Sequence, residues 1–133
     1  MPGFETLLES IAARPGMFVG KCSLRAVSDY LHGYDRALGD LGHSETPLGG
    51  WVRWVESRFL ISHPAWHWTR ILLHVYSSDR AAIEALPQLH REFLEQRALL
   101  GVQGIEDELE RRLIAQFGEP WFEPSTTTTT IGD

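Results

Sequence analysis

The sequence is poor in cysteine, in long hydrophobic runs and in lysine. Its single cysteine, Cys22, cannot form a disulfide within the chain, which is typical of a reducing compartment. Its apolar stretches are only a few residues long, whereas a membrane-spanning helix needs about 20. The N-terminus also lacks the basic and then apolar segments of a secretory signal. These absences predict a cytoplasmic protein with no membrane association.

A clustered basic surface is absent as well. The formal net charge is −6, and all cationic residues except Lys21 are arginine. Residues 51–83 carry four arginines against two acids, whereas residues 84–133 carry ten acids against four arginines. Proteins that bind nucleic acid normally gather their cations on one face. The charge pattern therefore predicts no nucleic-acid partner, and it leaves open whether a protein partner meets the basic middle or the acidic C-terminal half.

What is present is the composition of an ordinary globular domain. The chain has 133 residues, of which 43% are hydrophobic and 23% charged, enough to bury a core without disulfides or metals. We expect a single helical domain over residues 1–118 and a Pro/Thr-rich extended tail over residues 119–133. The predicted fold is all-α, a compact bundle of five to six helices. The alternative is an α+β fold with one or two short strands.

The helices are predicted from apolar residues that recur at i, i+3, i+4 and i+7. Residues 42–50, with three glycines and a proline, are expected to form a loop. Ser23 is expected to cap the second helix, and Gly33 within that helix predicts a close contact with another helix. A strand over residues 70–76 is the alternative for the fourth helix. The predicted helices cover residues 3–14, 24–41, 51–61, 64–76, 79–100 and 105–117.

Proline and glycine mark the expected breaks. Residues 17–20 are predicted to be a short apolar connector. Pro64 suits the first turn of a helix, where its missing N–H costs nothing. Pro87 lies inside a helical pattern and predicts a kink or a split near Ala85. Gly101 and Gly104 are expected to separate the last two helices.

Residues 14–20 read RPGMFVG, which is similar to a segment near the start of gyrase-B-like ATPase domains. In that family the next helix supplies a glutamate base and a magnesium-binding asparagine, and glycine-rich motifs then wrap the nucleotide. Here the next helix offers Asp29 and Asp35 but neither glutamate nor asparagine, and no DxGxG string follows. We therefore expect no ATP site and no cofactor.

A wider pattern covers about residues 8–95. It joins RPGMFVG to SLRAVSDYLHGY, then to WVRWVESRF, and then to SHPAWHWTRILLHVYSSDRAAIEAL. This pattern resembles a group of small bacterial proteins of unassigned activity that share an RPGM-aromatic-x-G start, a GY helix, an aromatic-rich helix and an S-H-x-x-W segment. The resemblance supplies no catalytic residues. Because such proteins are often encoded among toxin–immunity loci, it implies a non-enzymatic, immunity-like binding role.

The middle segment, residues 51–76, carries four of the five tryptophans. Trp66 and Trp68 would point roughly 200° apart on a helix, so one of them is expected to face outward. Tryptophan and arginine are enriched where proteins bind one another. The residues predicted to lie in the core are Trp51, Trp54, Phe59, Ile71, Leu72 and Val75. The residues predicted to bind a protein partner are Arg53, Arg58, His63, Trp66, His67 and Arg70.

Three histidines of this segment raise the alternative of a small metal-site enzyme. His63, His67 and His74 are separated by four and seven residues, a spacing that would place them on one face of a continuous helix. Against this, His63 directly precedes a proline, and the HExxH pattern is absent. No GxSxG string supplies a nucleophile either. We predict no catalytic residue and no metal ligand.

The tail ends in five consecutive threonines followed by Ile-Gly-Asp. We expect a plain extended terminus. The alternative is that the chain is a precursor in which an enzyme joins threonine hydroxyls to an acid as esters. The residues that this alternative involves are Thr126, Thr127, Thr128, Thr129, Thr130 and Asp133.

Overall fold

The fold is all-α, as predicted. The computed structural model describes residues 2–61, 63 and 65–117, and no strand occurs within these ranges. The strand alternative over residues 70–76 is therefore wrong, because that stretch is helical up to Val75. The tail over residues 119–133, with its candidate modification sites, lies outside the described residues. The helices are α1 (Pro2–Ala13), α2 (Pro15–Val19), α3 (Leu24–Asp40), α4 (Trp51–Phe59), α5 (Trp68–Val75) and α6 (Asp79–Phe117).

The RPGMFVG segment is helical where a connector was predicted. α1 buries Phe4, Leu8 and Ile11 and ends at Ala13. α2 then begins at once, with Pro15 at its first position. Proline is well suited to that position, because the first amide of a helix has no partner within the helix. The proline therefore both ends one helix and starts the next.

The start of α3 is held by two side chains. Ser23 accepts a hydrogen bond from the Ala26 amide at 3.2 Å, which confirms the predicted cap. Asp79, the first residue of α6, accepts one from the Leu24 amide at 2.8 Å. Further along, the close contact predicted at Gly33 is wrong, because this residue is exposed and a Cβ there would meet nothing within 4 Å.

The loop over residues 42–50 is confirmed, and Arg97 of α6 fixes it. The side chain of Arg97 is only 9% exposed. Its guanidinium donates to the carbonyl oxygens of Thr46 at 2.6 Å and Gly49 at 3.0 Å. It also stacks on the ring of Phe93, 5.1 Å from its centroid. One arginine therefore ties the loop before α4 to the long helix.

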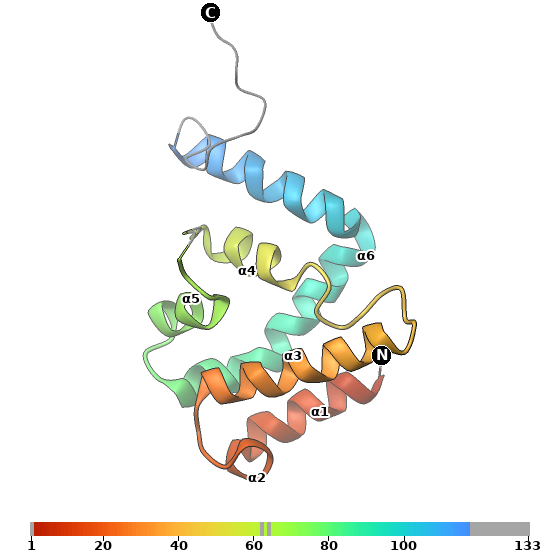
Figure 1. Cartoon of the computed structure of the whole chain (residues 1–133). Helices are drawn as coiled ribbons and strands as arrows, with labels where there is room; N and C mark the ends of the chain where they lie inside the picture. Colours follow the sequence, from red (N-terminus) through yellow and green to blue (C-terminus); the bar gives the residue numbers. More distant parts are fainter. Residues whose placement is uncertain (1, 62, 64, 118–133) are drawn as a thin grey trace, which may run out of the picture.

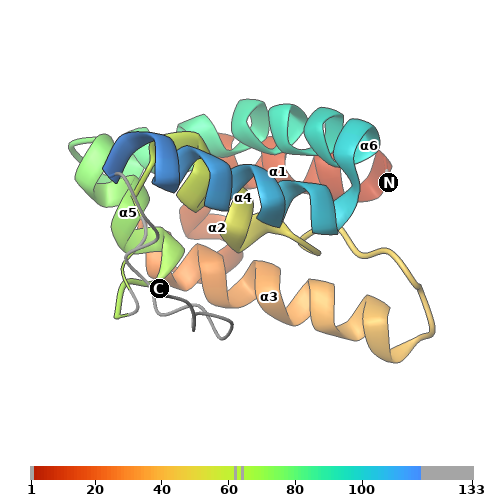
Figure 2. The ribbon, with the colours of Figure 1, turned by 90° about the horizontal axis from the view of Figure 1, so that it is seen from above.

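α6 consists of two arms that meet at Gly101. The backbone stays helical from Asp79 through Pro87 to Leu100, so the split predicted near Ala85 is wrong. Helical geometry is interrupted at Gly101, where φ is 74° and ψ is 170°. Figure 1 shows the second arm, residues 102–117, turning back above α4, and Figure 2 shows it crossing over α4 when seen from above.

An aromatic cluster forms the centre of the core. The ring of Trp51 lies 5.5 Å from each of the rings of Trp54, Trp68 and Phe93. These four residues come from α4, α5 and the first arm of α6, so the cluster joins three helices. Most of the predicted core of this segment is buried, namely Trp51, Trp54, Ile71 and Leu72. Phe59 is only half-buried, and Val75 is wrongly predicted because it is 43% exposed.

Candidate functional site

The six predicted binding residues do not form one surface. His63, Trp66 and Arg70 come together around the start of α5. Arg53 and Arg58 belong to α4, and each pairs with a glutamate. His67 lies against α3 instead. The structure therefore separates a small aromatic site from three residues with other contacts.

Trp66 is the centre of that aromatic site. Its ring is half-buried, and the Arg70 guanidinium lies over it, 4.4 Å from the ring centroid. The imidazole rings of His63 and His74 flank the indole at 5.8 and 5.7 Å. Such a cation–π contact stabilises the pair by about 0.5–1 kcal/mol at an exposed site. We call Trp66, Arg70, His63 and His74 the Trp66 cluster.

The turn before α5 positions this cluster. The Trp66 amide donates to the carbonyl of His63 at 3.0 Å, which closes a turn. α5 begins at Trp68, four residues later than predicted, because the backbone of His67 is extended. The His67 side chain caps the helix by accepting a hydrogen bond from the Thr69 amide. Trp68 is buried and Trp66 keeps part of its ring exposed. The two tryptophans therefore face differently, although only Trp68 belongs to the helix.

The charge of Arg70 is not balanced by any acid within the part of the chain that the structure describes. Arg53 pairs with the buried carboxylate of Glu56 at 2.8 Å, and Arg58 pairs with Glu92 at 3.1 Å. Arg70 is exposed and forms no ion pair with any described residue. α5 itself, WTRILLHV, contains no acid. The Trp66 cluster therefore combines a partly exposed aromatic ring with a positive charge that no described acid pairs with.

Leu73 extends this surface with apolar area. Positions 70, 73 and 74 share one face of α5, because residues three and four apart are neighbours on a helix. Leu73 is 37% exposed, and Arg70 and His74 are exposed beside it. The outer face of α5 thus combines aromatic, cationic and aliphatic groups.

His67 has a structural role on the other side of α5. Its Nδ1 lies 2.9 Å from the Thr69 hydroxyl oxygen, and its ring lies 6.0 Å from that of His32. The neighbouring indole N–H of Trp68 donates to His32 Nε2 at 2.8 Å. Burial, followed by the nearby Arg25 charge, lowers the pKa of His67 below its ordinary value.

The three histidines of the metal alternative are accordingly divided. His63 and His74 flank Trp66, whereas His67 faces His32. Within the part of the chain that the structure describes, no three His, Cys, Asp or Glu side chains gather in a way that could hold a metal ion.

His90 is a buried titratable residue that the sequence reasoning missed. It is 3% exposed, and its Nε2 donates to the Pro47 carbonyl at 2.8 Å. Its ring lies 4.9 Å from that of Phe4. Burial lowers its pKa below the ordinary value. The signal was available, because position 90 follows Leu86 by four and precedes Phe93 by three, which places it on the apolar face of α6.

Acidification is expected to destabilise the protein partly through His90. Its folded-state pKa lies below its unfolded value of about 6.5, so the unfolded chain takes up the proton first. Above the unfolded pKa the neutral His90 ring makes its full contribution to the free energy of unfolding. As the pH falls from there toward the folded-state pKa, this contribution is lost by at most about 1.4 kcal/mol per pH unit. Urea denaturation between pH 7.5 and 5.5 measures this slope.

His90→Gln is the matched variant, because its side-chain amide can still donate to Pro47 and does not titrate. We expect the free energy of unfolding of this variant to depend less on pH than that of the wild type. Equal slopes for the two proteins would show that His90 does not contribute.

Along residues 2–61, 63 and 65–117, none of the helices is both long and apolar enough to cross a membrane. Comparisons with protein-family models, with curated proteins and with solved structures found no match.

Proposed function

We propose that the chain is a non-enzymatic protein-binding domain of bacteria, which acts in the cytoplasm as an immunity-type inhibitor of a toxin. The observation that supports this most is the Trp66 cluster, in which the Arg70 guanidinium lies over a half-buried indole and forms no ion pair with any described residue. Tryptophan and arginine are the side chains that most often dominate binding energy at protein interfaces. The resemblance to small bacterial proteins of unassigned activity also favours it, because proteins of this kind are often encoded among toxin–immunity loci.

The geometry of the cluster suits a rigid anchor. The Arg70 guanidinium lies over the Trp66 ring, 4.4 Å from its centroid, and the rings of His63 and His74 lie within 6 Å of the indole. Side chains that already hold their bound arrangement lose less conformational entropy on association. A guanidinium that stacks through its face keeps its N–H groups free to donate in its plane, so it can bind a carboxylate with two hydrogen bonds. We therefore expect a partner with an acidic side chain beside an apolar patch.

Trp66→Ala and Arg70→Glu are expected to abolish capture of this partner. Truncation of a binding anchor costs about 2 kcal/mol or more, which is roughly 30-fold in Kd. The immobilised chain is used to capture proteins from a lysate of its bacterium, and the Kd of the purified partner is then measured by calorimetry. Arg80→Glu is the matched control, because Arg80 is an exposed arginine whose ion pair lies elsewhere, with Glu84.

Inhibition is tested by expressing the captured partner in a growing culture. The partner should arrest growth, the wild-type chain should relieve the arrest, and Arg70→Glu should fail to do so. A partner that is harmless, or that Arg70→Glu neutralises as well as the wild type does, contradicts the proposal. Circular dichroism of both variants checks that they remain folded.

A further inference from the structure

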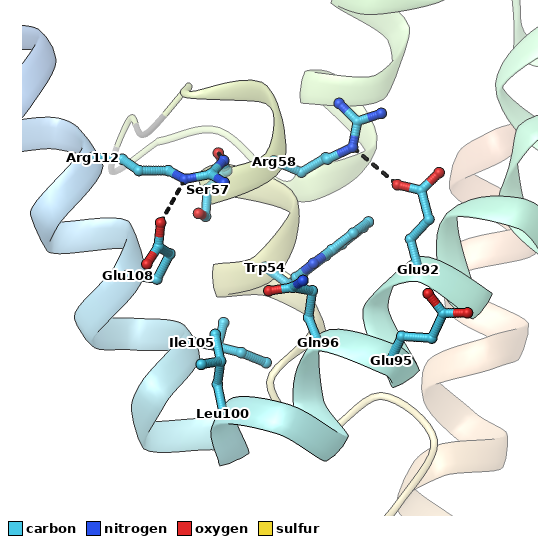
Figure 3. A pocket seen from close by; sticks show the side chains of 10 residues that line it. All are labelled: Trp54, Ser57, Arg58, Glu92, Glu95, Gln96, Leu100, Ile105, Glu108 and Arg112. Atoms are coloured by element: carbon cyan, nitrogen blue, oxygen red, sulfur yellow. Dashed lines mark hydrogen bonds and ion pairs between the residues drawn. The ribbon is translucent and has the colours of Figure 1, made fainter.

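A cleft of about 270 Å³ lies between α4 and the two arms of α6 (Figure 3). None of the four residues of the Trp66 cluster lines it. Its volume is close to the lower end of the range of about 300–1,000 Å³ in which proteins bind small molecules. The residues that line it are Trp54, Ser57, Arg58, Glu92, Glu95, Gln96, Leu100, Ile105, Glu108 and Arg112.

The cleft combines apolar side chains with a charged rim. Trp54 lies in the middle of it, and Leu100 and Ile105 are on its apolar side (Figure 3). The last two residues belong to different arms of α6, so the break at Gly101 is what brings them to the same cleft. An aromatic ring beside two aliphatic side chains suits the carbon skeleton of a small ligand.

The carboxylates of the cleft outnumber its guanidinium groups. Arg58 is engaged by Glu92 at 3.1 Å. Arg112 is engaged by Glu108 at 2.9 Å and by the Ser57 carbonyl at 3.0 Å. The third carboxylate, Glu95, makes no hydrogen bond or ion pair with any described residue. Glu108 also pairs with Arg111, which lies outside the cleft. Glu95 is therefore the one carboxylate of the cleft that has no ion-pair partner among the described residues.

Trp54 offers an unused hydrogen-bond donor in the same place. Trp54 is only 5% exposed, and its indole N–H donates no hydrogen bond to any described residue. Among the described side chains, the fully buried polar atoms without a hydrogen-bond partner are Ser28 Oγ and Trp51 Nε1. The Trp54 nitrogen is not one of them, so it keeps some contact with solvent. Buried indole N–H groups usually have a hydrogen-bond partner. Trp54, whose indole N–H is unpaired among the described residues, and Glu95, whose carboxylate is also unpaired there, thus both line one cleft.

We infer that this cleft binds a small free organic cation: an ammonium group on a short apolar stem that also carries a hydrogen-bond acceptor. The ammonium group pairs with Glu95, the stem lies along Leu100 and Ile105, and the acceptor meets the indole N–H of Trp54. This site goes beyond the proposed function, because it needs no protein partner.

The test uses 5-aminopentan-1-ol, which has all three features. Calorimetry should show saturable binding to the wild-type protein in the millimolar range or tighter. Pentane-1,5-diol lacks the charge and pentylamine lacks the acceptor, so each should bind at least about tenfold more weakly. The indole ¹H–¹⁵N resonance of Trp54, assigned with Trp54→Phe, should shift on addition of the aminoalcohol.

Glu95→Gln should weaken binding of the aminoalcohol at least about tenfold, and it leaves the fold intact because Glu95 is exposed. Glu84→Gln, on the same arm of α6 but outside the cleft, should bind like the wild type. Three results overturn the inference: no saturable binding, equal binding of the diol, or unchanged affinity in Glu95→Gln. Equal binding of pentylamine overturns the role given to Trp54.

Discussion

Exchange of Arg97 for methionine is expected to lower the free energy of unfolding by about 3 kcal/mol. Methionine keeps most of the aliphatic stem but removes the guanidinium that donates to the carbonyls of Thr46 and Gly49. Hydrogen bonds from charged groups contribute about 1.5–3 kcal/mol each when they are shielded from water, and the side chain of Arg97 is almost fully buried. Urea denaturation at neutral pH measures the loss.

Arg80→Met is the control for this exchange. Arg80 lies on the same arm of α6 but is exposed, and its ion pair with Glu84 spans 3.6 Å at the surface. Such pairs contribute less than about 1 kcal/mol. If the two variants lost the same stability, Arg97 would not hold the loop before α4 in place.

Gly101→Ala is expected to lower the free energy of unfolding by about 2 kcal/mol. The backbone angles of Gly101, φ 74° and ψ 170°, belong to a region that is essentially restricted to glycine, where other residues are strained by about 1–3 kcal/mol. Relief of this strain by straightening α6 would uncover Trp54 and Ile105, which are buried. Denaturation followed by tryptophan fluorescence reports both the stability and the exposure.

Gly33→Ala is the matched substitution and should have the opposite effect. Gly33 is exposed within α3, and an added Cβ meets nothing within 4 Å. Alanine is favoured over glycine inside a helix by about 1 kcal/mol, so this variant should be more stable than the wild type. Destabilisation of similar size in both variants would contradict the special role of Gly101.

The helices were predictable because their signal is local. Apolar residues at helical spacing predict α1 and α3, and the Ser23 cap predicts where α3 begins. None of these signals depends on residues far away in the sequence. The ends of the helices were harder to predict, because proline and glycine are each compatible with more than one local structure. Pro15 starts a helix as well as ending one, and Pro87 is accommodated inside a helix. The change of direction at Gly101 depends on the contact of the second arm of α6 with the core around Trp54. No local sequence pattern indicates such a contact.

The candidate site was predictable in composition but not in arrangement. The sequence indicates that tryptophan, histidine and arginine gather near α5, and the Trp66 cluster contains three of the six predicted residues. It cannot show that Arg58 pairs with Glu92, 34 positions away, while Arg70 pairs with no acid among the described residues. The cleft was missed entirely, because its walls come from α4 and two arms of α6 that are adjacent only after folding.

The second arm of α6 also affects the order of events during synthesis. It leaves the ribosome after every other described helix, yet Ile105 belongs to the same core as Trp51 and Trp54. Until residues 102–117 emerge, that face of the nascent chain stays open to water and to chaperones. The domain therefore completes this part of its core only after the second arm of α6 has left the ribosome.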